Sequence, residues 1–324
     1  MNENNNLSHP KTPAEYLRIF FTGFAMGSAD IVPGVSGGTM AFILGIYETL
    51  LDGIKSFNLT AIRHALKFDF KALFQHVPIR FLIALGLGIL AAILVLSDFL
   101  HHELETRPTY VFAFFAGLIV ASIVAVGVKV KWAPGSMISF TIATIFAFWL
   151  VGLPLLDDAG HSPLVLFLSG AVAICAMILP GISGSFILLV LGQYEYVLAA
   201  AKDLDIITLI PVVLGCAVGI LAFSRVVSYL LKNYHNVTVA ALVGFMVGAM
   251  RMIWDEAAAG VVLLNPSGSL DAGQIVIVLA LILIGFFLVT IMDHLQSGTN
   301  PVLAPVWKPR RPTNTIAEKA AALD

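Results

Sequence analysis

The chain has 324 residues, of which 59% are hydrophobic and only 12% are charged, and its formal net charge is −2. Soluble globular proteins carry about 25% charged residues, so this composition excludes that class. Disordered chains combine low hydrophobicity with high net charge, and nucleic-acid-binding domains carry an excess of basic residues. Neither description fits 18 basic and 20 acidic side chains. The remaining class is a polytopic integral membrane protein.

Apolar segments of about 20 residues are long enough to cross the hydrocarbon core of a bilayer. Six such segments follow one another along the chain, at 79–98, 109–128, 136–153, 206–231, 237–254 and 274–293. Two longer apolar stretches, 17–54 and 164–201, are each interrupted midway by a segment rich in proline and glycine. Proline and glycine disfavour a continuous helix, so each stretch predicts either a re-entrant helical hairpin or two full spans.

The two interruptions belong to an internal repeat. Residues 33–51 (PGVSGGTMAFILGIYETLL) align without gaps on residues 180–198 (PGISGSFILLVLGQYEYVL), with nine identities in nineteen positions. Three of the six spans follow each copy. We therefore expect a tail at 1–16, a first repeat at 17–153, a second repeat at 164–293 and a further tail at 294–324.

The distribution of basic residues predicts the orientation. If both broken stretches are hairpins and the N-terminus is cytoplasmic, 15 basic residues face the cytoplasm and three, Arg107, Lys202 and Arg251, face outward. Cytoplasmic loops of membrane proteins carry an excess of lysine and arginine, so this distribution supports the assumed orientation. Two full spans per broken stretch would give the same distribution of basic residues. The sequence therefore does not decide whether the broken stretches cross the whole membrane. The predicted fold is an all-α polytopic membrane protein with an inverted repeat, each half containing one re-entrant hairpin and three transmembrane helices, and with both termini cytoplasmic.

The repeated motif suits an anion. A helix that begins after each glycine-rich break presents unpaired N–H groups, and glycine lets a phosphate or carboxylate approach the backbone. Inverted repeats with broken helices in corresponding positions are typical of transporter sites near the midplane. The alternative is that these small residues only allow close helix packing. The candidate phosphate-binding residues are Gly34, Ser36, Gly37, Gly38, Thr39, Gly181, Ser183, Gly184 and Ser185.

Charged residues near the motifs are candidates for supporting roles. Asp30, Glu48 and Glu195 are candidate carboxylates for proton or cation coupling, because carboxylates inside a membrane are costly and are usually functional. Asp30 has Met177 as its counterpart in the second repeat, so the site is expected to be asymmetric. Glu48 and Glu195 could instead be interfacial. Arg225 and Arg251 are either additional phosphate ligands or anchors that reach the membrane surface.

The segments GSADIVPGVSGGTMAFILGIYE and LPGISGSFILLVLGQYEYVL resemble the bacterial polyprenyl-phosphate translocase family, formerly a membrane domain family of unknown function. The resemblance covers nearly the whole chain. It implies transport of undecaprenyl phosphate from the outer to the cytoplasmic leaflet of the inner membrane, which recycles the lipid carrier for peptidoglycan and other envelope polymers. It implies a polyprenyl phosphate lipid as the partner, no catalytic residues and no cofactor.

Two alternatives from other classes stay open. Undecaprenyl-diphosphate phosphatases are similar in carrying a Pro-Gly-x-Ser break, but they continue with Ser-Arg-Ser-Gly, whereas Gly37 and Gly184 follow the serines here. An ion-coupled secondary transporter of small anions would fit the inverted repeat equally well. A lipid substrate would additionally need a lateral opening between helices. No histidine has a partner at zinc-ligand spacing, so no metal site is expected.

Overall fold

A computed structural model of the chain describes residues 8–32, 35–156, 160–265, 267–297, 300–303 and 305. Across these residues the chain is helical and contains no strand. The helices of the first half are α1 (Pro13–Ile31), α2 (Gly37–Ile43), α3 (Tyr47–Lys55), α4 (Leu59–Leu66), α5 (Phe70–His76), α6 (Ile79–Thr106), α7 (Pro108–Gly127) and α8 (Pro134–Val151). Those of the second half are α9 (Pro163–Ile178), α10 (Gly184–Val190), α11 (Tyr194–Lys202), α12 (Ile206–Asn233), α13 (His235–Ala259), α14 (Val261–Leu264) and α15 (Ala272–Ser297).

Six of the described helical segments are long and apolar enough to cross a membrane: α6, α7, α8, α12, α13 with α14, and α15. Each predicted span overlaps one of them, which confirms the all-α polytopic class. Prolines at the first position of α7 and α8 mark where these helices begin, since proline lacks the N–H that is unsatisfied there anyway. Outward-facing leucine, isoleucine and phenylalanine side chains cover most of the outer helices, as a lipid environment requires.

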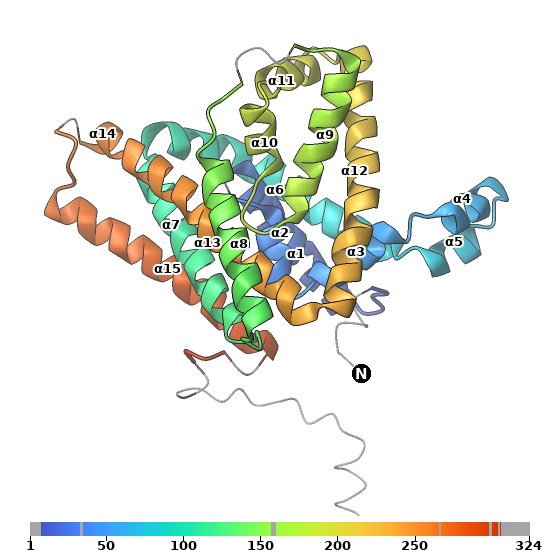
Figure 1. The fold of residues 1–324 in the computed structure, drawn as a ribbon, viewed down its shortest axis with the longest axis horizontal. Helices are drawn as coiled ribbons and strands as arrows, with labels where there is room; N and C mark the ends of the chain where they lie inside the picture. The colour runs from blue at the N-terminus through green and yellow to red at the C-terminus, as the bar shows by residue number, and fades with distance from the viewer. Residues whose placement is uncertain are drawn as a thin grey trace, which may run out of the picture.

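The helix order and the helix packing occur twice. Within the apolar windows of α7 and α13, 50% and 61% of the residues are buried, compared with 28% or less in the other spans. These two central helices pack against each other. In the first half α1 packs on α6, and in the second half α9 packs on α12 in the same way. The last span of each half packs on the central helix of the other half: α8 packs on α13, and α15 packs on α7. Figure 1 shows α9, α10 and α11 together in the upper part of the molecule, with α1, α2 and α3 below them.

Each broken stretch contains two interruptions, one more than the sequence predicts. The helices after the first interruption have matching bounds, Gly37–Ile43 and Gly184–Val190. A second interruption follows in each, at Gly45 (φ 70°) and Gly192 (φ 64°). Glycine adopts these left-handed angles without strain, and α10 and α11 meet there at 114°. The helix that begins after each break therefore ends before Glu48 and Glu195, which lie on the next helix, α3 or α11.

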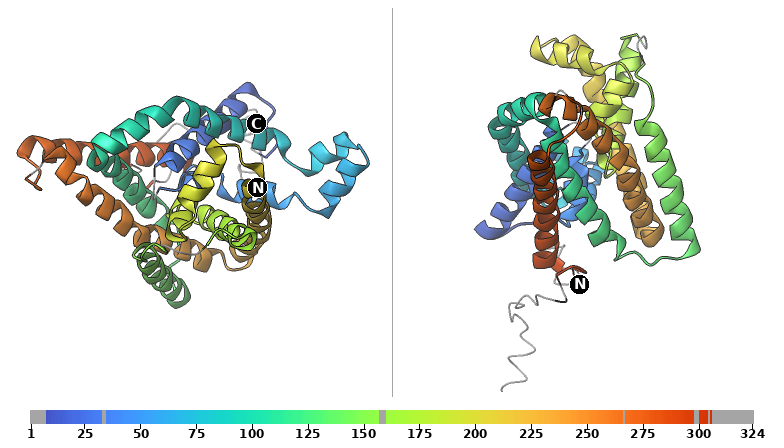
Figure 2. Two further views of the ribbon diagram at one scale, coloured as in Figure 1. Left: turned by 90° about the horizontal axis from the view of Figure 1, so that it is seen from above. Right: turned by 90° about the vertical axis from the view of Figure 1, so that its left-hand side faces the viewer.

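Residues 56–78 form a second departure from the expected pattern. The sequence predicts only a connecting segment on one side of the membrane, but the structure places α4 and α5 there as a short helical hairpin. Asn58 and Asp69 cap these two helices by accepting hydrogen bonds from backbone N–H groups of the first turn. The two helices pack on each other and project away from the rest of the molecule (Figures 1 and 2).

Candidate functional site

The first break lies between α1 and α2, and its residues Pro33 and Gly34 are outside the described part of the chain. Ser36 is fully buried and caps α2, because its hydroxyl accepts a hydrogen bond from the N–H of Gly38 at 3.1 Å. The N–H of Gly37 donates to Asp30 Oδ1 at 2.7 Å. The N-terminus of α2 is therefore already bonded to a carboxylate of the same chain.

The second break lies between α9 and α10 and is built in a similar way. Ser183 caps α10 and accepts a hydrogen bond from the N–H of Phe186 at 3.2 Å, while the Ser183 and Ser185 hydroxyl oxygens are 3.3 Å apart. Gly181 has a φ of +97°, which strongly favours glycine. The predicted helix start after each serine is confirmed.

The two breaks contact each other although more than 130 residues separate them in sequence. The N–H of Gly181 donates to the hydroxyl of Thr39 at 2.8 Å. The hydroxyl of Ser36 donates to the carbonyl of Met177 at 3.2 Å, and the hydroxyl of Tyr47 donates to the carbonyl of Ile178 at 3.0 Å. We call these three hydrogen bonds the break junction.

The side chains of the break junction are buried. Ser36, Thr39 and Tyr47 are each exposed by 3% or less. The carbonyls of Met177 and Ile178 belong to the last turn of α9 and its end, where helix carbonyls have no partner within the helix. The hydroxyls of the first broken stretch therefore satisfy orphan groups of the second.

Sequence reasoning did not assign a role to Tyr47. Its identity with Tyr194 in the repeat alignment was an available signal, but the two tyrosines differ in the structure. Tyr47 is 3% exposed and bonded across the break junction, whereas Tyr194 is 37% exposed. The identity alone could not reveal which copy lies inside.

The remaining predicted site residues lie apart from the break junction. Glu48 is exposed in the first turn of α3, and its carboxylate is 3.9 Å from the ring of His235. Glu195 is exposed in the first turn of α11. Arg225 is exposed on α12 and donates to the carbonyl of Leu221 in its own helix at 2.7 Å. Among the described residues, no hydrogen bond or ion pair joins these three side chains to either break.

Arg251 lies in a different cluster, between α8 and α13. Its guanidinium donates to the carbonyl of Phe148 at 3.1 Å, lies 4.6 Å from the centre of that ring, and is 3.5 Å from the carboxylate of Asp255. Phe148, Arg251 and Asp255 are among the residues that line a cavity of about 800 Å³ between α7, α8, α13 and α15. Arg251 is therefore positioned at a cavity but not at the break junction.

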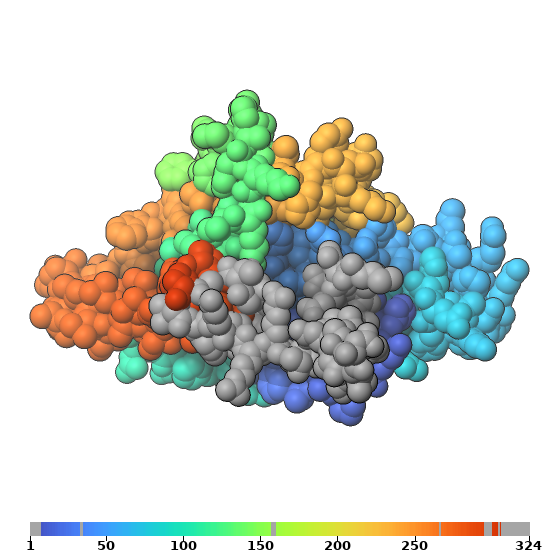
Figure 3. Space-filling model, turned by 90° about the horizontal axis from the view of Figure 1, so that it is seen from below, coloured from blue at the N-terminus to red at the C-terminus, as the bar shows by residue number. Residues whose placement is uncertain are grey.

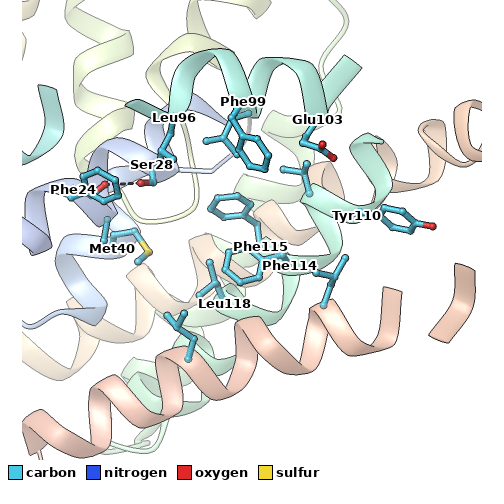
Figure 4. A pocket seen from close by; sticks show the side chains of 15 residues that line it. Phe24, Ser28, Met40, Leu96, Phe99, Glu103, Tyr110, Phe114, Phe115 and Leu118 are labelled. Carbon is cyan, nitrogen blue, oxygen red and sulfur yellow. Dashed lines mark hydrogen bonds between the residues drawn. The ribbon is translucent and has the colours of Figure 1, made fainter. Parts of the chain in front are cut away.

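A second cavity, of about 550 Å³, reaches α2, the helix that follows the first break. It is enclosed by α1, α2, α6, α7 and α15, and Figure 4 shows its aromatic and aliphatic walls. Met40, the residue after Thr39, lines this cavity together with Ser28. Glu103, near the C-terminal end of α6, and Tyr110, near the N-terminal end of α7, also line it. Apart from these polar groups the lining is apolar: Phe24, Ala25, Leu96, Phe99, Leu100, Val111, Phe114, Phe115, Leu118, Leu281 and Leu288. We call it the tail cavity.

The part of the chain that the structure describes contains no group of three histidine, cysteine, aspartate or glutamate side chains able to hold a metal ion. The chemistry available at the break junction is therefore that of backbone N–H groups, hydroxyls and the Asp30 carboxylate. Such groups bind and orient a ligand.

Comparison with known proteins identifies the family. A family model described as undecaprenyl phosphate translocase-like matches residues 26–270, which include both breaks and the helices around them. The chain belongs to this family. No solved structure matches it.

Two curated relatives of this translocase-like chain carry the name polyprenyl-phosphate transporter. The one from Vibrio cholerae serotype O1 is 41% identical over 242 residues, which cover 74% of this chain and 78% of the relative. The one from Staphylococcus aureus is 32% identical over 251 residues, covering 72% and 84% respectively. These findings confirm the family to which the sequence motifs pointed.

Proposed function

We propose that this protein moves undecaprenyl phosphate from the outer to the cytoplasmic leaflet of the bacterial inner membrane and so returns the lipid carrier to envelope synthesis. The transporter names of the two curated relatives support a polyprenyl phosphate substrate. The direction and the exact chemistry of the lipid are parts of our proposal. It treats the protein as a lipid transporter and not as an enzyme.

One observation carries the proposal: the break junction lies next to the tail cavity. Met40 lines the tail cavity, and its neighbour Thr39 bonds to Gly181 of the second break. A phosphate-headed lipid needs polar donors for its head group beside an apolar channel for its chain. The short helix α2 therefore contributes one residue to the break junction and the next to the tail cavity.

The head group is proposed to bind at the breaks through the residues that the sequence singles out. In the present arrangement the N–H of Gly37 already bonds to Asp30 Oδ1. A phosphate oxygen is an anionic acceptor like a carboxylate oxygen, so the substrate would take the place of Asp30 at this N–H. Arg251 and Arg225 are proposed to act only in other conformations, since neither bonds to a break here.

The proposed topology has both termini in the cytoplasm and the two broken stretches entering from opposite sides as an inverted repeat. It is supported by the 15-to-3 distribution of basic residues and by the repeated helix packing. In such an arrangement the breaks meet near the midplane, where both leaflets can be reached in turn.

Charge compensation is proposed to involve Asp30. A phosphate monoester carries about −1.5 to −2 charges at neutral pH, and moving it uncompensated through hydrocarbon is prohibitive. A proton or cation taken up at Asp30 would lower this cost at the break itself. Glu48 and Glu195 stay candidates for the same role nearer the ends of the broken stretches.

The test is reconstitution of the purified protein into vesicles with a labelled polyprenyl phosphate, scored in one assay for leaflet transfer and for release of inorganic phosphate. Thr39→Val should strongly reduce transfer, because it removes the acceptor for the N–H of Gly181 while keeping the side-chain volume. Thr109→Val is the matched control: Thr109 is also a buried residue whose hydroxyl bonds between helices, to the carbonyl of Ala257 at 2.8 Å, but away from the breaks.

Transfer by the wild type and by Thr109→Val, but not by Thr39→Val, supports the proposal. Phosphate release would instead support the phosphatase alternative, and transport of a soluble anion with no lipid transfer would support the small-anion transporter. Equal transfer by both threonine variants would contradict a role of the break junction.

A further inference from the structure

A basic pocket lies outside the proposed transport site, where the segment before α1 meets α5 and the start of α6. It has a volume of about 510 Å³, and Lys11, Lys71 and Arg80 line it together with His9, Phe74 and Gln75. No carboxylate belongs to its lining. Three cationic side chains from three separate elements thus converge on one cavity.

The nearby carboxylates are engaged elsewhere. Glu15 accepts hydrogen bonds from the backbone N–H groups of Lys11 and Thr12, at 2.7 and 3.3 Å, and so completes the cap of α1. Asp69 accepts from the N–H of Ala72 and caps α5. Within the described residues, none of the three basic side chains of the pocket forms an ion pair within 4.0 Å, although the carboxylate of Glu15 is near enough to interact electrostatically with Lys11. Lys71 and Arg80 therefore keep their charge available for a ligand.

Phe74 of the pocket lining belongs to a helical hairpin, α4 and α5, that exposes many apolar side chains, which is unusual for a surface that faces only water. The two helices and the turn between them expose large hydrophobic side chains: Leu59 by 81%, Leu66 by 75%, Phe68 by 78%, Phe70 by 54% and Phe74 by 49%. Figure 3 shows this hairpin projecting at one edge of the molecule. Basic residues beside exposed aromatic and aliphatic residues on a short helix are typical of helices that lie in the membrane interface.

We propose that the basic pocket binds the head-group phosphate of an anionic phospholipid, with the apolar side chains of α4 and α5 inserted among the lipid chains. Basic pockets at the cytoplasmic edge of membrane helices are suited to such head groups. A free phosphate ion would use the three cations but leave the exposed apolar side chains of the hairpin in water, so these side chains favour a lipid as the source of the phosphate. The inference does not depend on the transported substrate, because the pocket and the break junction share no residue.

The experiment measures binding of short-chain phosphatidylglycerol to the purified full-length protein in a neutral detergent, with phosphatidylcholine and sodium phosphate as comparison ligands. Each cation near an anionic lipid surface contributes about a fivefold gain in affinity, so Lys71→Gln with Arg80→Gln should weaken phosphatidylglycerol binding roughly thirtyfold. Lys202→Gln with Lys232→Gln removes two exposed charges far from the pocket along the chain and should leave binding unchanged.

Lys71→Gln alone changes one exposed side chain and should weaken binding about fivefold, which keeps the test valid if the double variant does not fold. Phosphatidylglycerol binding that equals phosphatidylcholine binding would overturn the proposal. So would an unchanged affinity in the pocket variants. Sodium phosphate that binds as tightly as phosphatidylglycerol, and loses affinity in the same variants, would show a site for a soluble anion instead.

Discussion

Gly38→Ala tests whether the two breaks must touch. A Cβ at residue 38 would lie 2.6 Å from the carbonyl oxygen of Met177 and 3.1 Å from that of Ile178, both backbone atoms of the other broken stretch. Ordinary van der Waals contact begins at 3.4 Å, so the stretches would have to separate by about 0.8 Å at the closest point. Backbone atoms cannot rotate away, and the whole break junction must therefore yield.

The cost follows from the bonds that such a separation would lengthen. The bond from Ser36 to Met177 is 3.2 Å and would exceed hydrogen-bonding distance after this shift, and the bond between Gly181 and Thr39 would be strained. Overpacking costs about 1–3 kcal/mol, and a lost buried hydrogen bond about 1 kcal/mol. Alanine gains up to about 1 kcal/mol in helix propensity. The expected net loss of stability is about 1–3 kcal/mol, with a larger loss of transport.

Thermal unfolding in detergent and the vesicle transfer assay would measure the two effects. Gly86→Ala is the matched control, because the same methyl group in α6 meets no atom within 4 Å and gains the same helix propensity. It should be neutral or slightly stabilising and should transport normally. A Gly38→Ala protein that is as stable and as active as Gly86→Ala would refute the importance of the break junction.

A cysteine at position 67 should be labelled only from the cytoplasmic side and one at 202 only from outside; outside labelling of Lys67→Cys would contradict the opposed hairpins. Asp30→Ala leaves the N–H of Gly37 without its acceptor and should cost about 1–3 kcal/mol in thermal unfolding, whereas Asp30→Asn keeps an acceptor and should cost less. Gly181→Ala forces a side chain to φ +97° and places its Cβ 3.0 Å from Met246 Cα, so it should reduce expression and stability more than Gly38→Ala; an equal or smaller effect would count against this reasoning.

The sequence predicted the membrane class, six spans and the two breaks because each rests on local properties. Long apolar runs must cross a bilayer as helices, since no other backbone structure except a closed barrel satisfies its polar groups there. Serine followed by glycine predicts a capped helix start, and Ser36 and Ser183 both act as N-caps.

The second interruption in each broken stretch was not predicted, because no proline marks it. Gly45 and Gly192 lie within apolar runs that read as continuous helix, and a single glycine costs a helix only about 1 kcal/mol. Their left-handed φ angles depend on how α3 and α11 pack on neighbouring helices, which a local pattern cannot show. The break junction was unpredictable for the same reason, since it joins groups that are far apart in the sequence.

The asymmetry between the two breaks limits what either can contribute to transport. In the proposed cycle a phosphate at the first break competes with Asp30 for the N–H of Gly37, whereas the equivalent position in the second repeat is Met177. The second break would then hold the head group without displacing a carboxylate of the chain.

A difference in affinity between two sites cannot by itself drive net movement, because a protein only redistributes the free energy of its ligands. Net transfer to the cytoplasmic leaflet must therefore come from a gradient of the lipid or of an ion. Asp30 is the described carboxylate at the break where uptake of a proton would both weaken the competing acceptor for the N–H of Gly37 and offset the phosphate charge.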